Sequence, residues 1–174
     1  MFQMQLKVEL SEEPRLVDTT DVEYDPETDD IRSLLRDICH HLASSGQAHF
    51  HVEGFGQSPW PVDVSTDLLT LLEQLPEAVA SLRSASKTDF QIDFYEQGIE
   101  RTLIFHKHDE RIRIQCLSGT KWVPNPSEEW ISHDDLNKML CELASRFVEV
   151  AKKTCPRTTT HEWFQEWSQA VLCE

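Results

Sequence analysis

The chain has 174 residues, of which 39% are hydrophobic, and it includes five Trp and eight Phe. These large apolar side chains are sufficient to fill one core, which excludes global disorder and predicts one domain over residues 1–174. Asp and Glu outnumber Lys and Arg by 31 to 16, giving a formal net charge of −15, which bears on the choice of partner rather than on fold.

The first predicted element is a strand over residues 2–10, because apolar and polar residues alternate through this segment. An acidic, proline-containing loop follows it. Thr28 is expected to cap a helix with an apolar stripe at helical spacing, and Gly46 is expected to end that helix. Alternation resumes over residues 47–53 and predicts a second strand.

A loop rich in Gly and Pro leads to a second helix, which should start at Ser65 or Thr66. Pro76 has no N–H for the helical hydrogen bond, so we expect a kink or a fresh helix there. Residues 88–117 then alternate in three short runs, which predicts a three-stranded antiparallel meander.

Two further helices are expected to begin at capping boxes, Ser132 with Asp135 and Thr159 with Glu162. The predicted order is therefore β-α-β-α-β-β-β-α-α. Because the meander connections are too short for parallel crossovers, we predict a single α+β domain. Its sheet should be mixed or mainly antiparallel, with helices packed on it.

The five cysteines are widely separated, lie in apolar segments and include no C-x-x-C pair, so buried free thiols are expected. The first residues lack the basic start and apolar run of a signal peptide. No apolar run approaches the roughly 20 residues of a membrane-spanning helix. We therefore expect a cytoplasmic protein without membrane contact.

Two H-x-H pairs, His49 with His51 and His106 with His108, are the clearest chemical signal. At strand spacing each pair projects from one face, and four imidazoles from two neighbouring strands could bind a metal. The same spacing is also explained if each pair lies on the solvated face of a sheet, opposite the apolar residues of its strand. No G-x-S-x-G, G-x-x-x-x-G-K or H-E-x-x-H pattern occurs, so we expect no enzyme, no cofactor and no metal.

Acidic residues are concentrated at the start of the chain, where residues 1–30 hold ten acids and two bases. A local cluster acts at encounter, because isolated exposed charges are screened beyond about 8 Å at physiological ionic strength. Trp is common among interface anchors, although an indole can also cover the rim of a core. The residues expected to dock a basic partner are Asp21, Glu23, Asp25, Asp29, Asp30 and Trp60.

This small, acidic chain without a catalytic motif resembles, in overall profile, the immunity proteins of bacterial polymorphic and contact-dependent toxin systems. The resemblance implies a protein that inhibits a basic partner, such as a nuclease-type toxin. Acidic nucleic-acid mimics of the anti-restriction or anti-CRISPR type share the profile, and an enzyme or metal-binding protein built on the His-bearing face is the third alternative. Direct binding to nucleic acid is not expected, because phosphate binding requires cationic groups.

Overall fold

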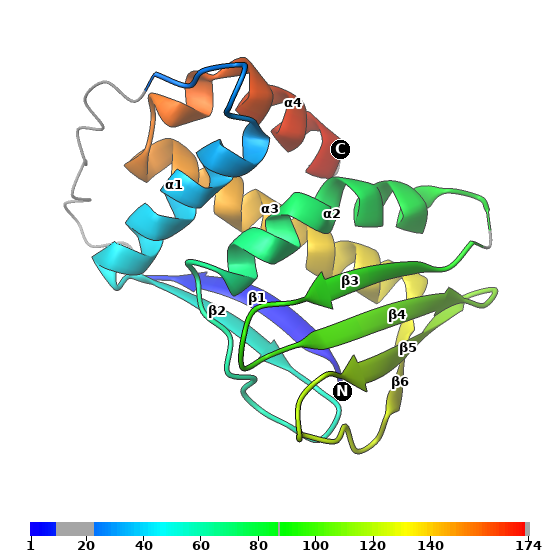
Figure 1. Cartoon of the computed structure of the whole chain (residues 1–174). Helices are drawn as coiled ribbons and strands as arrows, with labels where there is room; N and C mark the ends of the chain where they lie inside the picture. The colour runs from blue at the N-terminus through cyan, green and yellow to red at the C-terminus, as the bar shows by residue number, and fades with distance from the viewer. Residues whose placement is uncertain (10–22, 87, 173–174) are drawn as a thin grey trace.

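The computed structural model describes residues 1–9, 23–86 and 88–172 (Figure 1). Its helices and two antiparallel sheets confirm the predicted α+β class. The elements in chain order are β1 (Gln3–Val8), α1 (Ile31–Ser45), β2 (Ala48–Glu53), α2 (Asp67–Arg83), β3 (Phe90–Phe94), β4 (Arg101–Lys107), β5 (Arg111–Ser118), β6 (Glu128–Ser132), α3 (His133–Thr154), a short 3-10 helix (Thr158–Thr160) and α4 (Glu162–Val171).

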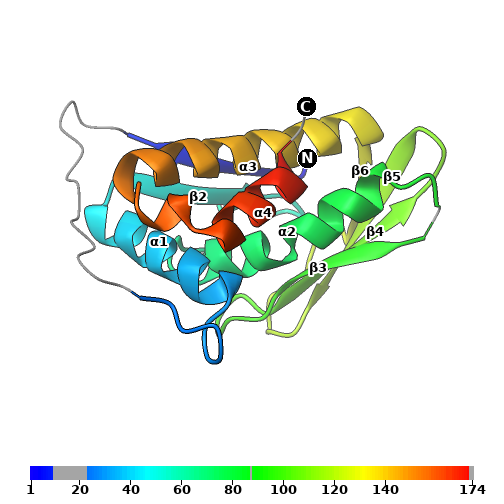
Figure 2. The same cartoon turned by 90° about the horizontal axis from the view of Figure 1, so that it is seen from above.

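Strand β1 pairs with β2 to form the smaller sheet, with Leu6 opposite Phe50. The larger sheet has the order β3-β4-β5-β6, so β3 and β6 are its edges. The helices gather on one side of the strands (Figures 1 and 2). The predicted apolar face of β1 is confirmed for Met4 and Leu6, which are buried, whereas Leu10 lies outside the described residues.

One strand was not predicted. Sequence patterning places a loop before Ser132, but β6 pairs with β5 there, with Trp130 opposite Arg113. Most of β6 is polar and at least partly exposed, and Ile131 is its one buried residue. A half-exposed edge strand lacks the alternating apolar pattern, so periodicity gave no signal.

Two predicted helix starts are wrong and two are confirmed, and Thr66 is the N-cap of α2, as expected. Asp30, not Thr28, caps α1, because its carboxylate accepts hydrogen bonds from the backbone N–H groups of Arg32 and Ser33. His161, not Thr159, caps α4. The Ser132 hydroxyl accepts from the Asp135 N–H at 3.0 Å and donates to the Asp135 carboxylate at 2.6 Å, so the side chains at α3 form a local cap.

Pro76 lies inside α2, which continues through it as one helix; the prediction of a new helix at this position is wrong. Proline leaves the carbonyl four residues earlier, that of Leu72, without its helical N–H. The indole N–H of Trp167 on α4 donates to this carbonyl at 3.0 Å. Packing between α2 and α4 thus satisfies the group that the proline releases.

We expect Trp167→Phe to lower the free energy of unfolding by about 1–3 kcal/mol, because a buried carbonyl loses its donor. Pro76→Ala supplies a backbone N–H to the same carbonyl, so it should recover part of that loss in the Trp167→Phe background. Urea unfolding of both single variants and the double variant measures this coupling. Additive effects would show that the two residues do not share the Leu72 carbonyl.

Cys39, Cys116 and Cys155 are free and buried, as predicted. Cys141 on α3 is disulfide-bonded, so the prediction of free thiols is wrong at this position. Cysteine usage therefore no longer supports a cytoplasmic location. Among the described residues, none of the helices has the length and apolar character needed to cross a membrane.

Candidate functional site

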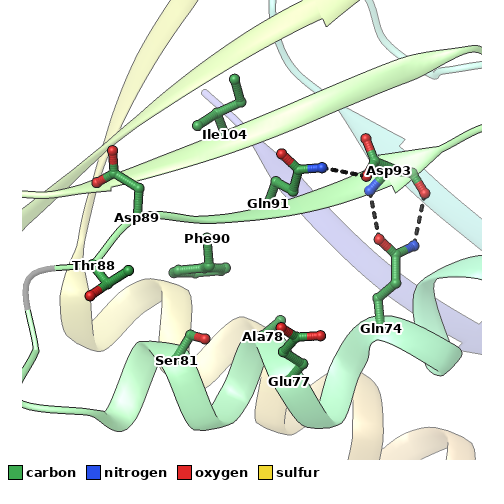
Figure 3. Close-up of a pocket in the computed structure, with 10 residues that line it drawn as sticks. All are labelled: Gln74, Glu77, Ala78, Ser81, Thr88, Asp89, Phe90, Gln91, Asp93 and Ile104. Carbon is green, nitrogen blue, oxygen red and sulfur yellow. Dashed lines mark hydrogen bonds between the residues drawn. The ribbon is translucent and has the colours of Figure 1, made fainter.

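A groove with a volume of about 500 Å³ lies between α2 and β3 (Figure 3). Its lining includes Phe90 from the buried face of β3 and both Gln91 and Asp93 from the opposite face. A cavity that reaches both faces of one strand must run along that strand's edge. We call it the β3-edge groove; its polar lining comprises Gln74, Glu77, Ser81, Thr88, Asp89, Gln91 and Asp93.

The side chain of Gln74 closes one end of the β3 edge. Its amide nitrogen donates to the Asp93 carbonyl at 2.8 Å, and its amide oxygen accepts from the Asp93 N–H at 2.8 Å (Figure 3). The same nitrogen donates to the Thr70 carbonyl of its own helix at 2.8 Å. Gln74 therefore takes the place that a neighbouring strand would occupy at Asp93.

Carboxylates dominate the charge of the groove. Asp93 accepts hydrogen bonds from Thr102 at 2.6 Å and from the Gln91 amide at 2.8 Å. Asp89 lies 2.6 Å from His106, and Glu77 is exposed on α2. These contacts orient two of the three carboxylates and leave a negatively charged rim.

The charge of Lys107 on β4 is committed to the end of α2, next to the groove residue Ser81. Its ammonium donates to the carbonyls of Ser81, Ser84 and Ser86 at 2.9, 2.7 and 2.6 Å. Basic groups are favoured at helix C-termini, where carbonyls lack helical partners. Lys107 thus stabilises the helix end while the carboxylates remain along the groove.

Further acidic residues lie near Glu73, which precedes the groove residue Gln74 on α2. Burial raises the pKa of Glu73, and the charges of Asp30 and Glu96 raise it further, against the opposing effect of Arg32. The Arg32 guanidinium lies 2.9 Å from the Glu73 carboxylate. Three separated segments, the start of α1, α2 and the region of β3, therefore place their acids next to one another.

Tyr95 stands at this junction with half of its side chain exposed, at 50%. Its hydroxyl donates to Glu73 at 3.3 Å and accepts from Arg32 at 3.4 Å. Tyrosine is enriched among the residues that anchor protein interfaces. Sequence reasoning missed this residue, because no periodic pattern distinguishes it from the buried aromatics of β3.

The predicted docking acids have local structural roles. Asp25 accepts from the Glu27 N–H at 2.9 Å, and Asp29 accepts from the Asp25 N–H at 3.1 Å. The hydrogen bond from Asp25 lowers the pKa of Asp29. Glu23 is exposed, and Asp21 lies outside the described residues. Together with the cap at Asp30, these bonds explain much of the acidic run as the start of α1.

Trp60 is not the exposed anchor that the sequence predicted, because only 2% of it is accessible. Its indole N–H donates to the Gly54 carbonyl at 3.1 Å. The ring packs against Phe2, Phe94 and Trp122. Flanking prolines marked a loop, but this loop folds inward and the indole belongs to the core.

Arg101 is a buried cation that lies against two indoles. Its guanidinium carbon lies 4.2 Å from the Trp60 ring centre and 3.5 Å from that of Trp122. It donates to Gln57 at 2.5 Å, while its Nε and Nη1 find no hydrogen-bond partner among the described residues. Burial lowers the pKa of Arg101 to about 10. The two ring faces stabilise the charge that water no longer reaches.

The four histidines do not converge, so the alternative of one metal site shared by neighbouring strands finds no support in the fold. His49 and His51 lie on β2 of the smaller sheet, whereas His106 lies on β4 of the larger one. His106 contacts Asp89, and His108 packs on Trp130 at 5.2 Å. Within the described ranges, no three His, Cys, Asp or Glu side chains are grouped as metal ligands would be.

Asp67, at the start of α2, is 3% exposed. Its Oδ2 accepts from the Asp63 N–H at 2.9 Å, and its Oδ1 has no partner in the described part of the chain. Burial is the main cause that raises its pKa to about 6. The folded state therefore favours the protonated carboxyl, and the stability contributed by this group falls as pH rises from about 4 to about 6.

We expect Asp67→Asn to stabilise the protein by about 2–3 kcal/mol near neutral pH and to have little effect near pH 4. The amide keeps an acceptor for Asp63 but carries no charge. Urea unfolding at both pH values tests this, with exposed Glu166→Gln as the control. A variant that is equally or less stable than wild type near neutral pH would contradict the assigned cost of the buried charge.

No protein-family model matches the chain, and neither a curated protein nor a solved structure shows significant similarity to it.

Proposed function

We propose that this chain is an acidic binding protein that captures and inhibits a basic protein partner, and that it acts as an immunity protein against a nuclease-type toxin. The observation that supports this proposal is the gathering of carboxylates from α2 and from the region of β3 along the open β3-edge groove, where Glu77, Asp89 and Asp93 all belong to the lining. His106 holds the carboxylate of Asp89 and Thr102 holds that of Asp93, so this part of the negative surface is fixed in shape.

A nuclease presents a basic surface, because it must bind the phosphates of its substrate. Complementary charge speeds the encounter of such a pair and can raise association to about 10⁸ M⁻¹s⁻¹ or more at low salt. An inhibitor seated on that surface would exclude nucleic acid. Tyr95 is the candidate anchor within the acidic surface, because it is half exposed and its hydroxyl is held by Glu73.

The experiment is growth rescue. Each open reading frame that flanks this gene in its source genome is expressed alone and together with this chain. We expect one frame to arrest growth, to encode a basic nuclease domain, and to be neutralised and co-purified by this chain. The immunity function would be contradicted if no flanking frame is toxic. It would equally be contradicted if this chain neither neutralises nor binds any frame that is toxic.

A further inference from the structure

We propose that the β3-edge groove binds an extended basic segment of the partner as an added strand, paired with the backbone of Gln91. This inference rests on the proposed function and specifies how that site would take its partner. It follows from the direction of the β3 backbone groups, the space beside them and the charge around that space.

The Asp93 N–H and C=O point away from β4, because both bond to the Gln74 side chain. In an antiparallel pair, successive residues alternate between bonding to the neighbouring strand and facing away from it. Gln91, two residues earlier and opposite Ile104, therefore also presents its N–H and C=O to the outer edge. This is the arrangement used in recognition by strand addition.

The groove lies along this edge and includes side chains from both faces of β3. An added strand would run about 4.7–4.9 Å from β3, on the side where Gln74 already bonds as a strand would. The groove volume of about 500 Å³ falls within the range of roughly 300–1,000 Å³ typical of binding pockets. Both backbone partners and space are therefore present at Gln91.

Charge identifies the kind of segment. Side chains of an added strand point alternately to the two faces. Those on one face would meet the carboxylates of Asp89 and Asp93, while those on the other would face Phe90 and Ala78 on α2. The groove thus fits a segment in which Lys or Arg alternates with small apolar residues, with Glu77 adding negative charge at the rim.

Gln91→Pro tests the pairing directly. It removes the outward N–H, and proline is tolerated in edge strands where that N–H faces solvent. Gln91→Ala is the matched control, because it removes the side chain and keeps the N–H. Circular dichroism and thermal melting check that both variants fold.

The probe is a synthetic peptide of alternating lysine and valine, compared with one of alternating glutamate and valine. We expect the lysine peptide alone to bind and to slow amide hydrogen exchange at Gln91, measured by NMR. Gln91→Pro should weaken the affinity for the lysine peptide at least about tenfold, whereas Gln91→Ala should change that affinity far less. Equal binding by folded Gln91→Pro, an unprotected Gln91 amide, or no binding of the lysine peptide would overturn the proposal.

The growth assay separates this inference from the proposed function. Loss of rescue by folded Gln91→Pro, with rescue kept by Gln91→Ala, supports strand addition. Full rescue by Gln91→Pro would overturn strand addition and leave the immunity function standing. If the lysine peptide binds at Gln91 but no flanking toxin is rescued, the immunity function falls and the groove remains a site for basic segments.

Discussion

Replacing Trp60 with alanine is expected to lower the free energy of unfolding by about 3–5 kcal/mol, the usual cost of deleting a buried indole. The ring is 2% exposed and packs on Phe2, Phe94 and Trp122. Its loss also removes one of the two aromatic faces that hold the Arg101 charge. Urea unfolding monitored by circular dichroism measures the change.

Trp130→Ala is the matched control, because this indole is 42% exposed. We expect its loss to cost less than about 1 kcal/mol, as for most surface positions. A small effect at Trp60, similar to that at Trp130, would contradict its assignment to the core. Such a result would restore Trp60 as a candidate partner anchor.

Gly56→Ala is the second large effect that we expect. Gly56 has φ +82, and an added Cβ would overlap the backbone carbonyl of Asn125. The left-handed backbone costs a side chain about 1–2 kcal/mol, and overpacking adds about 1–3 kcal/mol. The close approach also holds two loops together, since the Asn125 N–H donates to the Phe55 carbonyl at 2.9 Å.

Gly98→Ala separates strain from overlap. Gly98 has φ +97, but its added Cβ would meet nothing within 4 Å, so only the backbone cost applies. The difference in unfolding free energy between the two variants therefore measures the contact at Asn125. Equal losses at both positions would contradict the close packing of these loops.

The sequence was informative where the structure depends on local pattern. The alternation in β1 and β3 and the cap at Ser132 are confirmed, because these features follow from neighbours a few residues apart. The prediction of a fresh helix at Pro76 was wrong. The indole N–H of Trp167, far along the chain, donates to the carbonyl that the proline leaves without a helical N–H. Tertiary packing thus overrode a sound local rule.

The groove could not be predicted, because it depends on contacts between separate elements. Gln74 appears in the sequence as an ordinary polar helix residue, and only the fold brings its amide to Asp93. Arg101 likewise gives no signal in the sequence, because only the fold brings Trp60 and Trp122 against its guanidinium. The acidic run before α1 was visible, but its role in capping required the backbone geometry.

The central claim is that the acids around the β3-edge groove capture a basic partner. The most direct measurement is the association rate of the toxin domain identified by growth rescue, followed by stopped-flow fluorescence over a range of salt concentrations. The Glu77→Gln, Asp89→Asn double variant, which removes two carboxylates of the groove lining, is compared with wild type and with Glu166→Gln, which removes a charge from α4. We expect the double variant to associate more slowly at low salt and to show a flatter salt dependence, with the control unchanged. The same rate and salt dependence in the double variant as in wild type would contradict the account.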